Sequence, residues 1–176
     1  METNKDRQKK IMLVSKRLLI FAGISLVFTV IVFIPTFFYN YHFFISWLCF
    51  ECGIIGGFVS IQQRLKKIDK DELTLLSESW ASILLVPVYG GIFALILYIL
   101  FLSGLIKGDL FPHFNVPIFN NPVSTEDIKK LLSETYPQNG QDFAKFIFWS
   151  FLAGFSERFV PQIIKNVAKP SNEEDK

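Results

Sequence analysis

Four apolar segments, each close to the length that a helix needs to cross a bilayer, constrain the fold of this chain more than any other feature. A spanning helix takes about 20 mostly apolar residues. The segments are 18–38, 42–61, 81–106 and 143–160. The first and third are uncharged, the second contains only Glu51, and the fourth, which is shorter, contains Lys145, Glu157 and Arg158 near its ends. We expect an all-α integral membrane protein with a four-helix transmembrane domain over residues 18–164; a buried or half-inserted helix is the alternative for the fourth segment.

The composition also indicates a membrane protein. Of the 176 residues, 51% are hydrophobic and 20 are phenylalanine, and the mean hydropathy is +0.36. These values are too apolar for an ordinary soluble domain. The net charge of +2 indicates no strong attraction to nucleic acid, so we expect the lipid bilayer as a partner and no direct nucleic-acid binding.

Lysine and arginine predict the orientation of these segments. Fourteen of the 18 basic residues fall in 1–17, in 62–80 and from residue 158 onward, and four fall on the opposite side. Because cytoplasmic loops carry an excess of basic residues, we expect both termini in the cytoplasm and the protein in the cell (inner) membrane. Residues 1–17 form the basic N-terminus, and residues 165–176 a disordered polar tail.

The link between the second and third segments predicts a short amphipathic cytoplasmic helix. Ile61, Leu65 and Ile68 recur at helical spacing, so we expect the second helix to continue past the membrane surface as a stalk. Trp80 then lies at the interface before the third segment.

The outer loop of 36 residues, Lys107–Asp142, contains a second short helix. Its first part is rich in proline and asparagine and is expected to be irregular. Ser124 has the pattern of an N-cap with acidic residues in the following turn, a capping box. We expect Pro137 to end this helix, which carries one apolar face: Ile128, Leu131 and Leu132.

The second segment has two different faces. At about 100° per residue, small residues fall within one arc: Cys49, Cys52, Gly53, Gly56, Gly57 and Ser60. Small residues let two helix backbones approach closely in lipid, so we expect this face to pack against a neighbour. The opposite face carries Glu51 with larger side chains: Phe44, Trp47, Ile55, Phe58 and Gln62.

Glu51 needs a polar partner, because placing an ionised carboxylate in hydrocarbon costs several kcal/mol of free energy. Three arrangements satisfy it: protonation, a hydrogen bond from a donor on another helix, or a hydrated path. A structural glutamate and a functional one both fit the sequence.

The fourth segment repeats the pattern of a small face that ends in a carboxylate. Ser150, Ala153, Gly154 and Glu157 recur at i, i+3, i+4 and i+7. The alternative is a helix end that Glu157 and Arg158 anchor among the lipid headgroups. In the third segment a further group of small or helix-bending residues predicts a kink and a close contact: Pro87, Gly90, Gly91 and Ala94.

Catalytic and metal chemistry find little support in the sequence. Cys49 and Cys52 form a C-x-x-C with no second pair, which favours packing over metal binding. His42 and His113 stand alone, and no nucleophile–base pattern is present. We expect no enzyme activity and no cofactor.

Three stretches, "FLAGFSERFVPQII", "GGFVSIQQRL" and "GLIKGDLFP", resemble a pattern of small multi-pass bacterial membrane proteins, some of them similar to membrane effectors of antiphage defence operons. The resemblance implies an oligomeric inner-membrane protein, a pore subunit that disrupts the membrane when triggered. The residues that match its C-terminal motif, without an assigned role, are Gly154, Ser156, Glu157, Arg158 and Pro161.

Two functions follow as hypotheses. In the first, the protein is a homo-oligomeric channel or pore effector in which Glu51 and Gln62 face a hydrated path. In the second, it is a non-conducting membrane anchor or sensor that recruits a cytoplasmic partner through residues 62–80.

Overall fold

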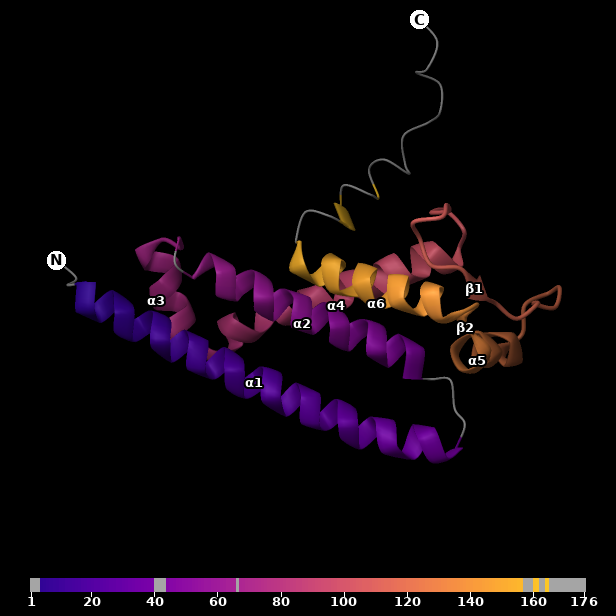
Figure 1. Cartoon of the computed structure of the whole chain (residues 1–176), viewed down its shortest axis with the longest axis horizontal. Helices are drawn as coiled ribbons and strands as arrows, with labels where there is room; N and C mark the ends of the chain where they lie inside the picture. Colours follow the sequence, from indigo (N-terminus) through magenta and orange to yellow (C-terminus); the bar gives the residue numbers. More distant parts are fainter. Residues whose placement is uncertain (1–3, 40–43, 66, 157–159, 162–163, 165–176) are drawn as a thin grey trace, which may run out of the picture.

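The computed structural model describes residues 4–39, 44–65, 67–156, 160–161 and 164 of the chain. The described residues form helices and one small antiparallel sheet (Figure 1). In chain order the elements are α1 (Asn4–Tyr39), α2 (Phe44–Arg64), α3 (Lys70–Glu78), α4 (Trp80–Leu102), β1 (Phe114–Asn115), α5 (Thr125–Glu134), β2 (Tyr136–Pro137) and α6 (Gly140–Phe155).

Three helices in the described part of the chain, α1, α2 and α4, are long and apolar enough to cross a membrane. The first predicted segment corresponds to α1, the second to α2 and the third to α4, which ends four residues earlier than expected. α6 is not among the three. Its 16 residues span about 24 Å at 1.5 Å per residue, less than the roughly 30 Å of a hydrocarbon core. The fourth membrane span therefore stays a prediction.

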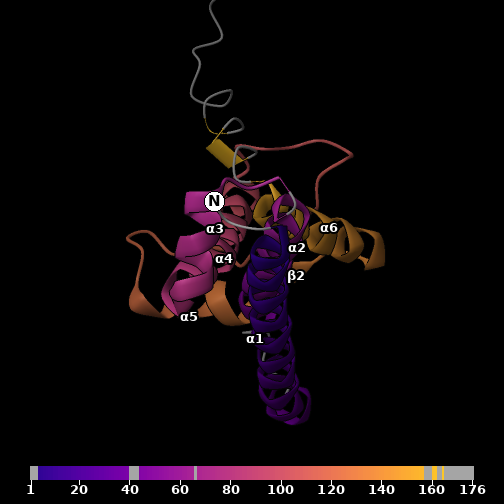
Figure 2. The ribbon, with the colours of Figure 1, turned by 90° about the vertical axis from the view of Figure 1, so that its left-hand side faces the viewer.

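α1 is a single helix of 36 residues that joins the basic N-terminal segment to the first apolar segment. At 1.5 Å per residue it is about 54 Å long, so it extends well beyond the thickness of a hydrocarbon core. In both views it lies to one side of α2, α4 and α6 (Figure 1, Figure 2).

α2, α4 and α6 pack closely together and enclose one of two buried apolar clusters. Its members are Ile45, Cys49, Ala94, Leu97, Tyr98, Phe101, Ile106, Phe146, Ala153 and Val160. The second cluster joins α1, the end of α2, α3 and the start of α4. Its members are Val14, Leu18, Phe58, Ile61, Leu65, Ile68, Leu73, Leu76 and Ile83.

The sequence predicted that the second helix continues past the second segment as a stalk that includes Leu65 and Ile68, and this prediction is wrong. α2 ends at Arg64, although the Leu65 N–H still donates to the Ile61 carbonyl at 3.0 Å, and the chain then turns into the separate helix α3. Ile61, Leu65 and Ile68 are all buried. These three residues pack in one buried cluster with α3. A straight stalk would instead have exposed them to solvent.

The outer loop is more regular than expected. β1 lies in its proline-rich first part and pairs antiparallel with β2, with Phe114 opposite Pro137. Pro137 is therefore a strand residue, and α5 ends three residues before it, at Glu134. The apolar residues of α5 do not form a core: Ile128 and Leu132 remain exposed.

The capping box of α5 is present. The Asp127 N–H donates to Ser124 Oγ at 3.3 Å, and the Ser124 N–H donates to Asp127 Oδ2 at 2.8 Å. The Ser124 N–H and the Ser124 hydroxyl both donate to Asp127 Oδ2, and these two hydrogen bonds lower the pKa of the Asp127 carboxyl. The cap therefore combines two hydrogen bonds with a negative charge at the positive end of the helix dipole.

The variant Ser124→Ala removes this cap and is expected to destabilise α5 by about 1 kcal/mol. Hydrogen exchange of the α5 amides measures the effect, which corresponds to roughly fivefold faster exchange. Ser133→Ala is the matched control, because the Ser133 hydroxyl donates only to the Lys129 carbonyl within the same helix. Equal exchange rates in the two variants would contradict the cap.

The same cap predicts a pH dependence. Because the pKa of Asp127 is lower in the folded loop than in an unfolded chain, its charge stabilises α5 fully above the ordinary carboxyl pKa of about 4. That stabilisation is lost as the pH falls through the lowered pKa. Hydrogen exchange between pH 6 and pH 3 should show faster α5 opening on acidification, and Asp127→Asn should remove most of this dependence.

Candidate functional site

Glu51 lies in the middle of α2 with its side chain turned toward α1. The residue is 3% exposed, and the Ser25 hydroxyl donates a hydrogen bond to its Oε1. Of the three arrangements that the sequence left open for this carboxylate, the single chain has a hydroxyl donor on another helix. The donor comes from an uncharged segment in which the sequence analysis singled out no residue.

A second polar contact joins the same two helices. The Trp47 indole N–H donates to Thr29 Oγ1 at 3.3 Å, and the rings of Phe28 and Trp47 meet edge to face at 5.4 Å. Ser25 and Thr29 are one turn apart on α1. We call these two contacts the α1–α2 polar seam; its residues are Ser25 and Thr29 of α1 and Trp47 and Glu51 of α2.

Outside this seam and the cluster near α3, α1 is barely buried. Of its spanning stretch 6% of the residues are buried, against 50% for α2 and 39% for α4. Large apolar residues of α1 are exposed along its length: Leu19, Ile20, Ile24, Leu26, Val27, Phe28, Val30, Ile31, Phe33 and Ile34. The seam therefore supplies the hydrogen bonds recorded between α1 and α2 in the described part of the chain at this depth.

The small face of α2 lies against α4 and α6. A Cβ added to Gly53 would stand 2.5 Å from the Gly90 carbonyl oxygen, and one added to Gly154 would collide with the Gly53 carbonyl oxygen. The three glycines form what we call the glycine joint, in which three backbones touch. No side chain larger than hydrogen fits at any of the three positions without moving a helix.

Two more glycines of α2 extend the joint. A Cβ on Gly56 would collide with the Phe151 carbonyl oxygen of α6, and one on Gly57 would lie 2.8 Å from the Cα of Pro87 in α4. The close neighbours of this face thus belong to the same chain. The remaining predicted packing residue of α2, Ser60, is buried.

Cys49, one of the two cysteines of this face, is buried and hydrogen-bonded. The Cys49 Sγ donates to the Ala94 carbonyl at 3.2 Å, and the Ser150 hydroxyl lies 3.3 Å from that sulfur and 2.8 Å from the Phe146 carbonyl. Cys52 is partly exposed, and both cysteines are free. Within the residues that the structure describes, no group of three His, Cys, Asp or Glu could hold a metal ion.

Gln62 is exposed near the end of α2, eleven residues after Glu51. In one chain the two do not line a common open path, because α1 covers Glu51. Glu157 and Arg158, predicted as polar membrane residues, lie outside the described residues.

His113, read from the sequence as a lone histidine, approaches the N-terminus of α6. Its Nδ1 lies 3.4 Å from Asp142 Oδ1, and the Lys145 Nζ lies 3.4 Å from the same oxygen. Burial raises the pKa of the Asp142 carboxyl, but the hydrogen bonds from His113 and Lys145 outweigh burial and hold that pKa below its usual value. The contact between His113 and Asp142 connects the segment that precedes β1 to α6.

Comparison of the chain with protein-family models, with curated proteins and with solved structures found no match. The resemblance to bacterial membrane effectors stays a prediction.

The glycine joint predicts the response to a larger side chain. Gly53→Leu forces α2 away from α4 and α6 and is expected to destabilise the fold by about 1–3 kcal/mol or more, as overpacking does. Tryptophan fluorescence during thermal unfolding in detergent measures the loss. Gly23→Leu is the matched control, because a Cβ there meets no atom within 4 Å. Equal melting temperatures for the two variants would contradict the close contact.

Proposed function

We propose that the protein is a homo-oligomeric pore or channel effector of the inner membrane, with both termini in the cytoplasm, in which α1 covers Glu51 in the closed state. One observation carries the proposal. The carboxylate in α2 is buried and hydrogen-bonded to α1, a helix whose apolar stretch is mostly exposed.

The energetics of lipid favour a displaceable α1. Apolar surfaces of two helices gain no hydrophobic energy by meeting in a bilayer, because lipid chains are equally apolar. The two hydrogen bonds of the seam, at about 0.6–2 kcal/mol each, therefore contribute much of the attachment of α1 at this depth, together with the ring contact of Phe28 and Trp47. A trigger of modest binding energy is enough to separate α1 from α2.

Displacement of α1 would uncover one polar face of α2. Eleven residues separate Glu51 and Gln62, which at 100° per residue places them on the same side of the helix, about 16 Å apart along its axis. In a ring of several copies this face supplies a ring of carboxylates, an arrangement that favours cations in pores. The glycine joint would keep α2, α4 and α6 together as the fixed part of each subunit. The resemblance to antiphage effectors supports a role in bacterial defence.

A second candidate function, a membrane anchor that recruits a cytoplasmic partner, is supported by the outer face of α3. Leu73 and Leu76 of that helix are buried, whereas Leu75 is 62% exposed. It is surrounded by exposed acidic residues of the same helix: Asp71, Glu72 and Glu78. An exposed leucine among carboxylates fits a partner with an apolar pocket and a basic rim.

Conductance of the purified protein in planar bilayers tests the pore function. Ser25→Ala removes a seam hydrogen bond of about 1 kcal/mol, so we expect about fivefold higher open probability than in the wild type. Glu51→Gln keeps a hydrogen-bonding group without the charge and should lower the preference for cations over anions. Ser103→Ala is the control, since the Ser103 hydroxyl donates to the Leu100 carbonyl and accepts from the Leu105 N–H, both local contacts at the end of α4.

Absence of conductance from both the wild type and Ser25→Ala would overturn the pore function. Unchanged ion selectivity of a conducting Glu51→Gln variant would remove Glu51 from the conduction path. If the wild type does not conduct in planar bilayers and Leu75→Arg loses the activity that the wild type has in cells, the anchor function is supported instead.

A further inference from the structure

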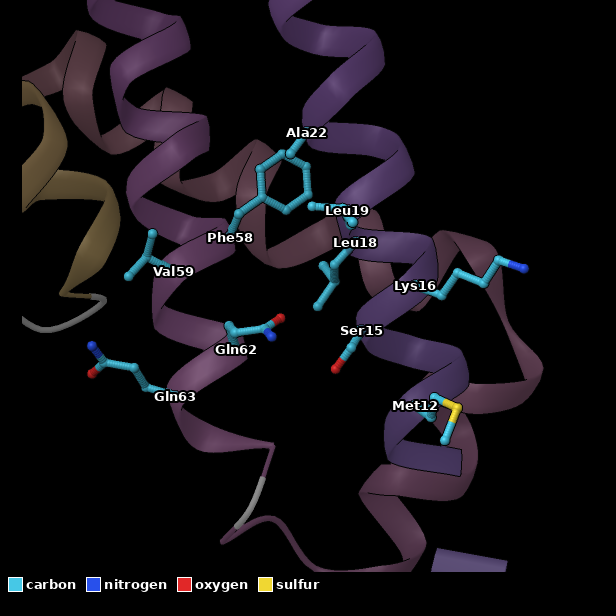
Figure 3. A pocket seen from close by; sticks show the side chains of 10 residues that line it. All are labelled: Met12, Ser15, Lys16, Leu18, Leu19, Ala22, Phe58, Val59, Gln62 and Gln63. Atoms are coloured by element: carbon cyan, nitrogen blue, oxygen red, sulfur yellow. The ribbon is translucent and has the colours of Figure 1, made fainter. Parts of the chain in front are cut away.

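A groove of about 490 Å³ runs between α1 and α2 at the end of the molecule that carries the basic residues. Its lining is mostly apolar, with Leu19, Ala22 and Phe58 among its residues, and its polar side chains are Ser15, Lys16, Gln62 and Gln63. Figure 3 shows the side chains of Ser15 on α1 and Gln62 on α2 pointing toward each other across it. Its volume lies within the roughly 300–1,000 Å³ of ligand sites.

The polar part of the groove coincides with the membrane boundary that the sequence predicts. The first span is expected to begin at residue 18 and the second to end at residue 61. Lys16 and Gln62 therefore lie at the headgroup level, whereas Ala22 and Phe58 lie at the depth of the acyl chains. The groove changes from polar to apolar in the same direction as the lipid leaflet beside it.

The basic residues of α1 divide between two faces. On one face Arg7 donates to the Ile68 carbonyl at 3.1 Å and Arg17 to the Ser77 carbonyl at 2.7 Å. Lys10 on the same face bonds to α3 as well. These three cations hold α1 to the segment that contains α3.

The other face carries a stripe of exposed lysines. Lys5, Lys9 and Lys16 are exposed and recur at i, i+4 and i+11, which places them on one side of the helix. Lys16 lines the groove, and in Figure 3 its ammonium group points away from α2. The stripe gives one edge of the groove a positive charge.

We propose that this groove binds one anionic phospholipid of the surrounding leaflet. An acyl chain lies between Leu19, Ala22 and Phe58, where an alkyl chain meets only apolar atoms. The phosphate lies at the polar end, at the hydroxyl and amide donors of Ser15 and Gln62, and Lys16 at the edge of the groove adds positive charge beside it. A zwitterionic lipid fits the same slot but gains less from the lysine stripe, because its head carries no net charge. Lipid binding here does not depend on whether the protein conducts.

Native mass spectrometry of the purified protein, delipidated and then supplied with phosphatidylglycerol or phosphatidylcholine, tests the proposal. We expect one retained lipid per chain, with phosphatidylglycerol preferred. Lys16→Gln should reduce retention of phosphatidylglycerol about fivefold, the factor for one basic side chain beside an anionic surface, and leave phosphatidylcholine unchanged. Lys129→Gln, a change of the same charge on exposed α5, is its control.

Ala22→Phe fills the apolar part of the groove and should abolish retention of both lipids. Ala81→Phe makes the same change at an exposed position of α4 and should retain the lipid. Unchanged retention in Ala22→Phe, or equal retention of the two lipids by the wild type, would overturn the proposal. A shift of the oligomer mass in Ala22→Phe with no change in lipid content would also overturn it, and would assign the groove to a second copy of the chain.

Discussion

Backbone contact at the glycine joint determines how the other elements of this protein are arranged. Gly53, Gly90 and Gly154 bring α2, α4 and α6 so close that their carbonyl groups occupy the space a Cβ would need. In lipid, close packing of this kind replaces the hydrophobic effect as the force between helices. The buried apolar cluster around Phe146 follows from this approach, because three helices at short separation leave no room for lipid between them.

α1 is attached by different means. Near its N-terminus it contributes Val14 and Leu18 to a buried cluster, and its arginines bond to carbonyls around α3. Farther along, at the depth of Glu51, the polar seam replaces apolar packing. The protein thus combines a closely packed three-helix unit with a helix that is anchored at one end and joined to α2 in the middle by hydrogen bonds and one ring contact. Both the proposed gating and the lipid groove depend on this difference in packing.

Two carboxylates of the protein occupy environments suited to their charge. Asp127 and Asp142 receive hydrogen bonds at helix N-termini in the outer loop, where negative charge is favourable. Glu51 has no such environment: it is buried in a helix long and apolar enough to cross a membrane, with a single hydroxyl donor that the structure records. If α2 spans the membrane as we propose, a carboxylate with so little compensation is the strongest functional signal in the chain.

The sequence by itself determined the apolar segments, the small-residue arcs and the capping signal at Ser124, because hydropathy, helical periodicity and caps are properties of neighbouring residues. Only the tertiary structure decided which helices the glycines meet, that Ser25 is the partner of Glu51, and that Ile61, Leu65 and Ile68 close a cluster with α3. The reason is physical. An apolar helix face can be covered equally well by lipid or by any other helix, so its partner follows from the fit of backbone and side-chain shapes across residues far apart in the sequence.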